Sequence, residues 1–154
     1  MKIWVDADAC PNAVKNVIFK VARRRNIKVT LVANQFMRIP ESELFNFIQV
    51  GAGFNEADEK IVTLIDKNDL VITADIPFAA DVVKKNALAL NPRGEIYTED
   101  NIQARLSMRD FMEALRMGGE ISGGPAPLDK QNIQDFTNAL DKYLTKIEQE
   151  KYLR

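Results

Sequence analysis

The chain has 154 residues, of which 46% are hydrophobic and 28% are charged, and its formal net charge is −1. These values are typical of one globular domain over residues 1–154 with a substantial core, and they exclude a disordered chain and a polycation that coats nucleic acid. No apolar run approaches the roughly 18 residues needed to cross a bilayer. We therefore expect a cytoplasmic protein without membrane contact.

In chain order, the hydrophobic pattern predicts a strand ending at Asp6, a helix from Pro11 to Arg25, strands over 28–33 and 45–50, a helix after Asn55, a strand over 70–74, a helix from Ile76, strands over 87–90 and 95–98, and helices over 101–117 and 130–150. The first strand, helix and strand have the length of a right-handed parallel crossover. The apolar strand over 70–74 suits a central parallel strand covered on both faces. The order of elements thus predicts an α/β protein with a mostly parallel sheet.

The residue types exclude several catalytic machineries. There is no histidine and only one cysteine, Cys10. A Ser-His-Asp or Cys-His triad, an HExxH zinc helix and a multi-thiolate metal site are therefore excluded. Cys10 stands near a helix start, where a thiol pKa can be lowered, but we interpret it as a small buried residue. Carboxylate sites favour hard cations, so Mg²⁺ or Mn²⁺ is the expected cofactor.

Aspartates recur at strand ends and helix starts, namely Asp6, Asp8, Asp58 and Asp75. Each also has a structural explanation, since Asp58 fits a capping box that starts at Asn55 and Asp75 fits the cap of the next helix. The carboxyl ends of parallel strands meet at one sheet edge, however, and crowded carboxylates repel one another unless a divalent cation compensates. The pattern therefore predicts a metal site. Such cations could activate water and stabilise the leaving oxygen of a phosphodiester.

Three arginines are candidates for binding substrate phosphates through bidentate contacts, namely Arg38, Arg93 and Arg109. The irregular stretch 122–127 has the glycines of an anion-binding backbone nest, but it lacks the ending of a P-loop. We interpret this stretch as a connector between helices.

Several segments together resemble the YaiI/YqxD family of uncharacterised bacterial proteins, in order along nearly the whole chain: Trp4-Val5-Asp6-Ala7-Asp8-Ala9-Cys10-Pro11, Asn55-Glu56-Ala57-Asp58, Val71-Ile72-Thr73-Ala74-Asp75-Ile76-Pro77, Asn91-Pro92-Arg93-Gly94 and Ser122-Gly123-Gly124-Pro125. That family is grouped with PIN-like domains, whose known members are metal-dependent ribonucleases and flap-type nucleases. The resemblance implies a three-layer α/β/α fold.

The resemblance also implies an acidic site with Asp6, Asp58 and Asp75 as metal ligands and Asp8 or Asp81 as helpers. The position of Asn55 is commonly aspartate in the family motif, so a ligand would be missing there. On this basis we expect a metal-dependent nuclease that acts on RNA or DNA.

Two other functions are compatible with the residues. A phosphatase of the haloacid-dehalogenase type would use Asp6 as nucleophile, Asp8 as acid and base, and Thr73 as a phosphate-binding hydroxyl, but Cys10 stands where that motif has Thr or Val. A non-catalytic adaptor would bind nucleic acid or protein, with the acids serving as helix caps. An adaptor's melting temperature should hardly respond to manganese, whereas a metal site is stabilised by mass action. The sequence leaves the oligomeric state open.

Overall fold

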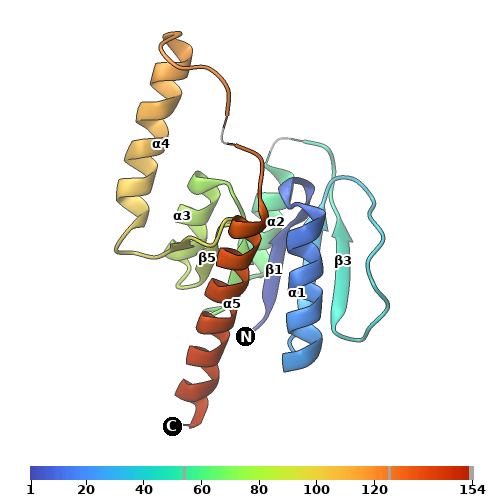
Figure 1. Ribbon diagram of the computed structural model, residues 1–154. Helices are drawn as coiled ribbons and strands as arrows, with labels where there is room; N and C mark the ends of the chain where they lie inside the picture. The colour runs from blue at the N-terminus through green and yellow to red at the C-terminus, as the bar shows by residue number, and fades with distance from the viewer. Residues whose placement is uncertain (54, 125, 153–154) are drawn as a thin grey trace.

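The computed structural model describes residues 1–53, 55–124 and 126–152, and these form a sheet with helices on both faces (Figure 1). The strands are β1 (Ile3–Asp6), β2 (Val29–Ala33), β3 (Phe45–Gln49), β4 (Leu70–Ile72), β5 (Leu88–Leu90) and β6 (Ile96–Tyr97). The helices are α1 (Asn12–Arg25), α2 (Glu56–Leu64), α3 (Ile76–Lys84), α4 (Ile102–Met117) and α5 (Lys130–Tyr152), with a short 3-10 turn, η1 (Ala7–Ala9), after β1. The predicted strands and helices are confirmed in type and order.

The strands lie in the order β3-β2-β1-β4-β5-β6, and only β6 runs antiparallel to its neighbour. The chain moves outward from β1 to β3 and then returns to place β4 on the other side of β1. The strand order therefore reverses between β1 and β4. In open parallel sheets, ligands bind outside the carboxyl ends of the strands at this point of reversal.

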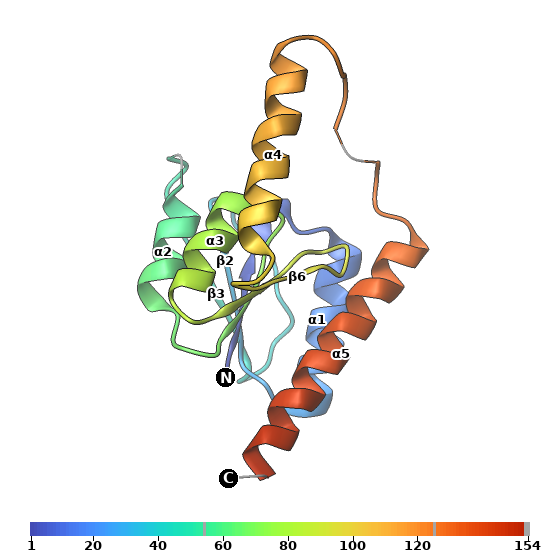
Figure 2. The same ribbon diagram turned by 90° about the vertical axis from the view of Figure 1, so that its left-hand side faces the viewer.

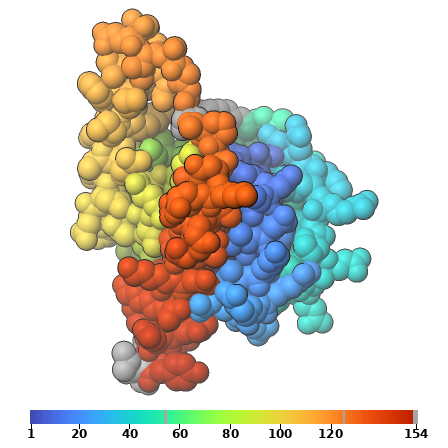
Figure 3. All heavy atoms as spheres, viewed as in Figure 1, coloured from blue at the N-terminus to red at the C-terminus, as the bar shows by residue number. Residues whose placement is uncertain are grey.

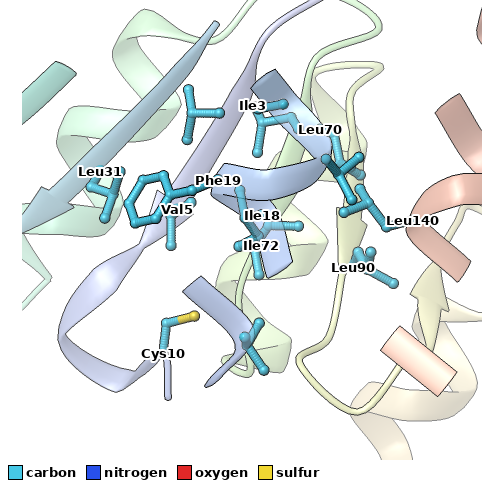
Figure 4. Packing of buried hydrophobic residues seen from close by; sticks show 14 of the residues in the cluster. Ile3, Val5, Cys10, Ile18, Phe19, Leu31, Leu70, Ile72, Leu90 and Leu140 are labelled. Carbon is cyan, nitrogen blue, oxygen red and sulfur yellow. The ribbon is translucent and has the colours of Figure 1, made fainter. Parts of the chain in front are cut away.

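Two hydrophobic layers cover the sheet, because successive side chains of a strand point to opposite faces. Ile3 and Val5 of β1 face a core that contains α1 and α5, as Figure 4 shows around Ile18 and Leu140. Trp4 faces the opposite core, which is built with α2 and α3. Figure 2 shows these helices on the two sides of the sheet. The protein is thus a three-layer α/β/α structure.

The helix ends follow from local chemistry. Asp75 caps α3, because its Oδ1 accepts a hydrogen bond from the backbone N–H of Phe78 at 3.0 Å, and Pro77 suits the first turn. Asn26 ends α1 in the left-handed region, with φ of 58°. Pro11 has an extended backbone and precedes α1 as its N-cap, so the helix begins one residue later than predicted.

Helix α4 departs from the compact packing of the other helices. Ile102 is its one buried residue, and its other end extends past the carboxyl edge of the sheet (Figures 1 and 2). The side chains of Met108 and Phe111 are 52% and 58% exposed. Figure 3 shows the C-terminal end of α4 projecting from the rest of the molecule. Within the described residues, no helix is both long and apolar enough to cross a membrane.

Candidate functional site

The candidate site begins where β1 and β4 end side by side. Asp6 is the last residue of β1, and Thr73 directly follows β4. The Thr73 hydroxyl donates to Asp6 Oδ2 at 2.9 Å and accepts a hydrogen bond from the backbone N–H of Asp75 at 3.1 Å. Thr73 therefore joins the two acidic segments and orients the Asp6 carboxylate.

Thr73 is only 2% exposed. We predicted that its hydroxyl binds a substrate phosphate; in the structure its one proton is donated to Asp6, and contact with a phosphate stays a prediction. A threonine after an apolar strand carries no sequence signal that separates these two roles. The supporting role depends on the neighbouring strand, which lies 67 residues away in the chain.

All four predicted catalytic carboxylates, those of Asp6, Asp8, Asp58 and Asp75, line one pocket of about 350 Å³. Asp8 lies in η1, and its Oδ2 accepts a hydrogen bond from the backbone N–H of Asn34 at 2.8 Å, which ties the turn to the end of β2. The segment 51–53 completes one wall. The pocket thus lies at the carboxyl edge, where the strand order reverses.

Two carboxyl groups of this pocket, those of Asp6 and Asp58, have a raised pKa. The pKa of Asp58 is raised to about 6, first by burial and then by the charges of Asp6, Asp75 and other nearby acids. The pKa of Asp6 is also raised, chiefly by burial and further by the charges of Asp75 and Asp8, although the Thr73 hydrogen bond acts in the opposite direction. None of the ion pairs among the described residues includes these aspartates or Asp8. The pocket therefore carries uncompensated negative charge.

The arrangement sets limits on the kind of metal site that it could form. Within residues 1–53, 55–124 and 126–152, no three carboxylate or thiol side chains are close enough to enclose a metal ion by themselves. This excludes a dedicated cage in the described geometry. Mg²⁺ commonly binds through one or two carboxylates, several waters and the phosphates of a substrate. The oxygen ligands of the pocket fit that mode.

Asn55 is a further candidate ligand. It stands at the N-cap position of α2 in the left-handed conformation, with φ of 66°, and its side chain makes no capping hydrogen bond. The side-chain capping that we predicted at this position is therefore wrong. Asn55 lines the acidic pocket together with Asp58, where its amide oxygen could bind a hard cation.

A second, larger hollow of about 680 Å³ adjoins the first and shares Asp58 and Asp75 with it. Asp81 from α3 and Arg109 from α4 also line this hollow. Arg109 is thus the predicted phosphate-binding arginine that the structure brings next to the carboxylates. Its Nη1 lies 3.2 Å from Asp110 Oδ1, and about half of the side chain is exposed.

The other two predicted arginines lie elsewhere. Arg38 is exposed on the loop after β2 and lines neither hollow. Arg93 donates to Asn132 Oδ1 at 3.2 Å and to the backbone carbonyl of Ala126. It therefore ties the turn before β6 to the beginning of α5, and contact with substrate stays a prediction for both residues.

Cys10 has no catalytic environment. Its side chain is 6% exposed, and burial raises the pKa of its thiol to about 12. A thiolate at this position is therefore strongly disfavoured. Our interpretation of Cys10 as a small buried residue is confirmed.

Comparison with known proteins places this geometry in a family. Residues 4–146 match the sequence model of a family described as "Uncharacterized BCR, YaiI/YqxD family". A UPF0178 protein of Maridesulfovibrio salexigens is 60% identical over 95% of this chain and 97% of its own length. UPF0178 proteins of Shewanella amazonensis and Hydrogenovibrio crunogenus are 57% and 54% identical, over 96% and 98% of this chain and 99% and 100% of their own lengths. No solved structure matches significantly. The chain therefore belongs to the YaiI/YqxD family, as its strand-end and turn motifs predicted.

Proposed function

We propose that this protein is a PIN-like, divalent-metal-dependent hydrolase of phosphodiester bonds in RNA or DNA. One observation carries the proposal: Asp6, Asp58 and Asp75 line one pocket at the reversal of strand order, where burial and the neighbouring acids raise the pKa of both Asp6 and Asp58. Such a cluster is costly to keep ionised without a compensating cation. A phosphodiester is a fitting substrate, because its phosphate oxygens complete the coordination of a cation that the protein holds only in part.

In this proposal, Asp6, Asp58 and Asp75 would share the holding of Mg²⁺ or Mn²⁺ with waters, substrate phosphate oxygens and the Asn55 amide oxygen, because no three carboxylates among the described residues enclose an ion by themselves. When bound, the cation supplies the positive charge that activates water and stabilises the leaving oxygen. Thr73 keeps the Asp6 carboxylate in one orientation through its hydrogen bond of 2.9 Å. Asp8 is exposed at the rim and orients the attacking water, while Arg109 binds a phosphate oxygen of the substrate.

The phosphatase of the haloacid-dehalogenase type receives less support. It requires a hydroxyl that binds the substrate phosphate, and the buried Thr73 hydroxyl already makes two hydrogen bonds. The non-catalytic adaptor is kept as the alternative outcome of the experiments below.

The test is cleavage of labelled single-stranded RNA, single-stranded DNA and duplex, in manganese and in chelator. We expect metal-dependent cleavage by the wild type and a loss of at least about 100-fold in Asp6→Asn, Asp58→Asn and Asp75→Asn, since removing a metal ligand costs more than removing its outer-shell partner. Asp135→Asn is the matched control, because Asp135 is exposed on α5, outside both acidic hollows, and its side chain accepts a hydrogen bond from Gln131. The proposal would be overturned if the folded wild-type protein cleaved none of these nucleic acids, or if cleavage persisted in chelator.

A further inference from the structure

A groove lined by arginine and apolar side chains runs beside the acidic pocket. It has a volume of about 480 Å³, and α4 forms one wall with Arg105, Met108, Arg109, Met112 and Arg116. The segment 121–124 also lines the groove. Arg116 Nε donates to the carbonyl of Gly123 at 3.3 Å, which holds this segment against the end of α4.

The lining of the groove is rich in guanidinium groups. Within the described part of the chain, its lining contains three arginines and no acidic residue. Each arginine has one acidic neighbour outside the lining: Arg105 Nε lies 2.6 Å from Glu95, Arg109 Nη1 lies 3.2 Å from Asp110, and Arg116 Nη1 lies 3.4 Å from Glu113. A guanidinium has five N–H donors, so donors remain for a ligand. The three side chains are between 36% and 44% exposed.

The groove adjoins the acidic hollow. Arg109 lines both of them, and Ile76 of the groove directly follows Asp75 of the acidic site. Figure 2 shows that α4 leads away from this place, beyond the edge of the sheet. Carboxylates at one end and guanidinium N–H donors at the other suit a ligand that places one phosphate at a cation held by the carboxylates and its further phosphates along α4.

We infer that this groove binds one flank of a single-stranded nucleic acid whose scissile phosphate lies in the acidic pocket, an inference that rests on the proposed function. Arg105 and Arg116 are eleven residues apart, which corresponds to roughly 16 Å along a helix, so the arginines can contact successive phosphates. Met108 and Met112 lie between the arginines and offer flexible apolar surface to the faces of unpaired bases. A duplex keeps those faces stacked inside the helix. The groove therefore selects single strands, independently of base sequence.

The test measures binding without catalysis. A fluorescent single-stranded oligonucleotide of about 16 residues is titrated in chelator with wild type, with the double variant Arg109→Gln/Arg116→Gln, and with Arg23→Gln/Arg24→Gln as control. Arg23 and Arg24 are exposed in the last turn of α1, outside the lining of the groove, so the control removes the same charge. Circular dichroism and thermal melting verify that each variant is folded.

We expect the groove variant to weaken binding by about tenfold or more and to reduce the slope of log K against log salt by about 1.4, because two phosphate contacts to a single strand are lost. The control variant and the wild type should bind the oligonucleotide with the same affinity and the same salt dependence. RNA and DNA strands should bind alike if phosphates and base faces dominate, and a preference for RNA would add a 2′-hydroxyl contact. Duplex should bind more weakly.

Equal loss in the control variant, or unchanged binding in the groove variant, would overturn the inference. Wild type that binds no single strand in chelator would also overturn it and would point to a protein occupant of the groove. Because no cleavage is measured, strand binding by the groove can succeed even where metal-dependent cutting fails. The two proposals are therefore separable.

Discussion

At the scale of single residues, two buried polar side chains hold opposite ends of the central strands. Thr73 joins Asp6 to Asp75 at the carboxyl edge. At the other end, Asp69 is 1% exposed and accepts hydrogen bonds from Trp4 Nε1 and from the backbone N–H groups of Lys2 and Asp66, at 2.9 to 3.0 Å. Buried polar groups are tolerated when their hydrogen bonds are complete. Both residues therefore fix how β1 and β4 sit side by side.

The raised pKa of Asp58 predicts a pH dependence of stability. A carboxyl whose pKa is about 6 in the folded state and about 4 when unfolded destabilises the folded state once it ionises. Its contribution is therefore neutral below pH 4 and becomes unfavourable as the pH rises to 6 and above. Asp58→Asn should thus stabilise the protein by about 1 kcal/mol at pH 7.5 in chelator, after a discount for solvent screening, and should have little effect at pH 4.

The measurement is urea unfolding of wild type and Asp58→Asn at both pH values, with Asp135→Asn as the control. The difference between the two proteins isolates Asp58 from the other carboxyls that titrate in the same range. A variant that is equally stable relative to wild type at both pH values would show that the Asp58 carboxyl is not perturbed.

At the scale of elements, the start of α3 combines a structural and a chemical role in one residue. The Asp75 side chain caps the helix through the Phe78 N–H and also lines both acidic hollows. Asparagine caps a helix nearly as well as aspartate, whereas alanine does not. The two roles can therefore be separated by the choice of substitution.

We expect Asp75→Asn to leave the free energy of unfolding nearly unchanged and Asp75→Ala to lower it by about 1 kcal/mol, because only alanine removes the cap. Both variants should lose metal-dependent cleavage, since neither retains the carboxylate. Denaturant unfolding and the cleavage assay, run on the same preparations, give the two readouts. Full activity in Asp75→Asn would show that Asp75 acts only as a helix cap.

Helix α4 is amphipathic, but only the beginning of its apolar side packs against the rest of the protein. Ile102 and Leu106 pack against the core beside α3, whereas Met108 and Phe111 remain more than half exposed. Isolated helices of this length are marginal in water, so the projecting half gains little stability from its own sequence. A single-stranded nucleic acid bound along the arginine side of α4 would contact Met108 and Met112. These contacts would stabilise the projecting half of the helix.

At the scale of the whole molecule, the parallel sheet brings distant segments to one place. Asp6, Asp58 and Asp75 belong to three separate elements, and the return of the chain from β3 to β4 sets them around one pocket. Charge repulsion in that pocket opposes folding, and a bound cation removes it. Metal binding should therefore be visible in the stability of the entire fold.

Manganese at about 100 times its dissociation constant should stabilise the protein by about 2.7 kcal/mol, which raises the melting temperature of a chain of this size by roughly 5 to 10 °C. Asp6→Asn should reduce the rise in melting temperature with manganese, whereas Arg109→Gln/Arg116→Gln should leave this rise unchanged. Differential scanning fluorimetry against metal concentration provides the measurement. An unchanged melting temperature in the wild type would favour the adaptor.

Much of this architecture was predictable from local patterns. Runs of apolar residues and their punctuation by Pro, Gly and Asn determined the type and order of the strands and helices, because these depend on neighbours a few residues apart. The predicted meeting of Asp6, Asp8, Asp58 and Asp75 followed from one topological rule, that parallel strands share a carboxyl edge. The fit of Pro77 and Asp75 to the start of α3 was local in the same way.

Only the tertiary structure decided which long side chains reach the site. Arg109 arrives there because α4 packs beside α3, while the similar Arg93 is drawn to Asn132 at the start of α5. The buried role of Thr73 and the groove along α4 likewise depend on segments that are far apart in the chain. The physical reason is that strand and helix periodicity reports contacts between near neighbours, whereas the partner of a side chain is fixed by how whole elements pack.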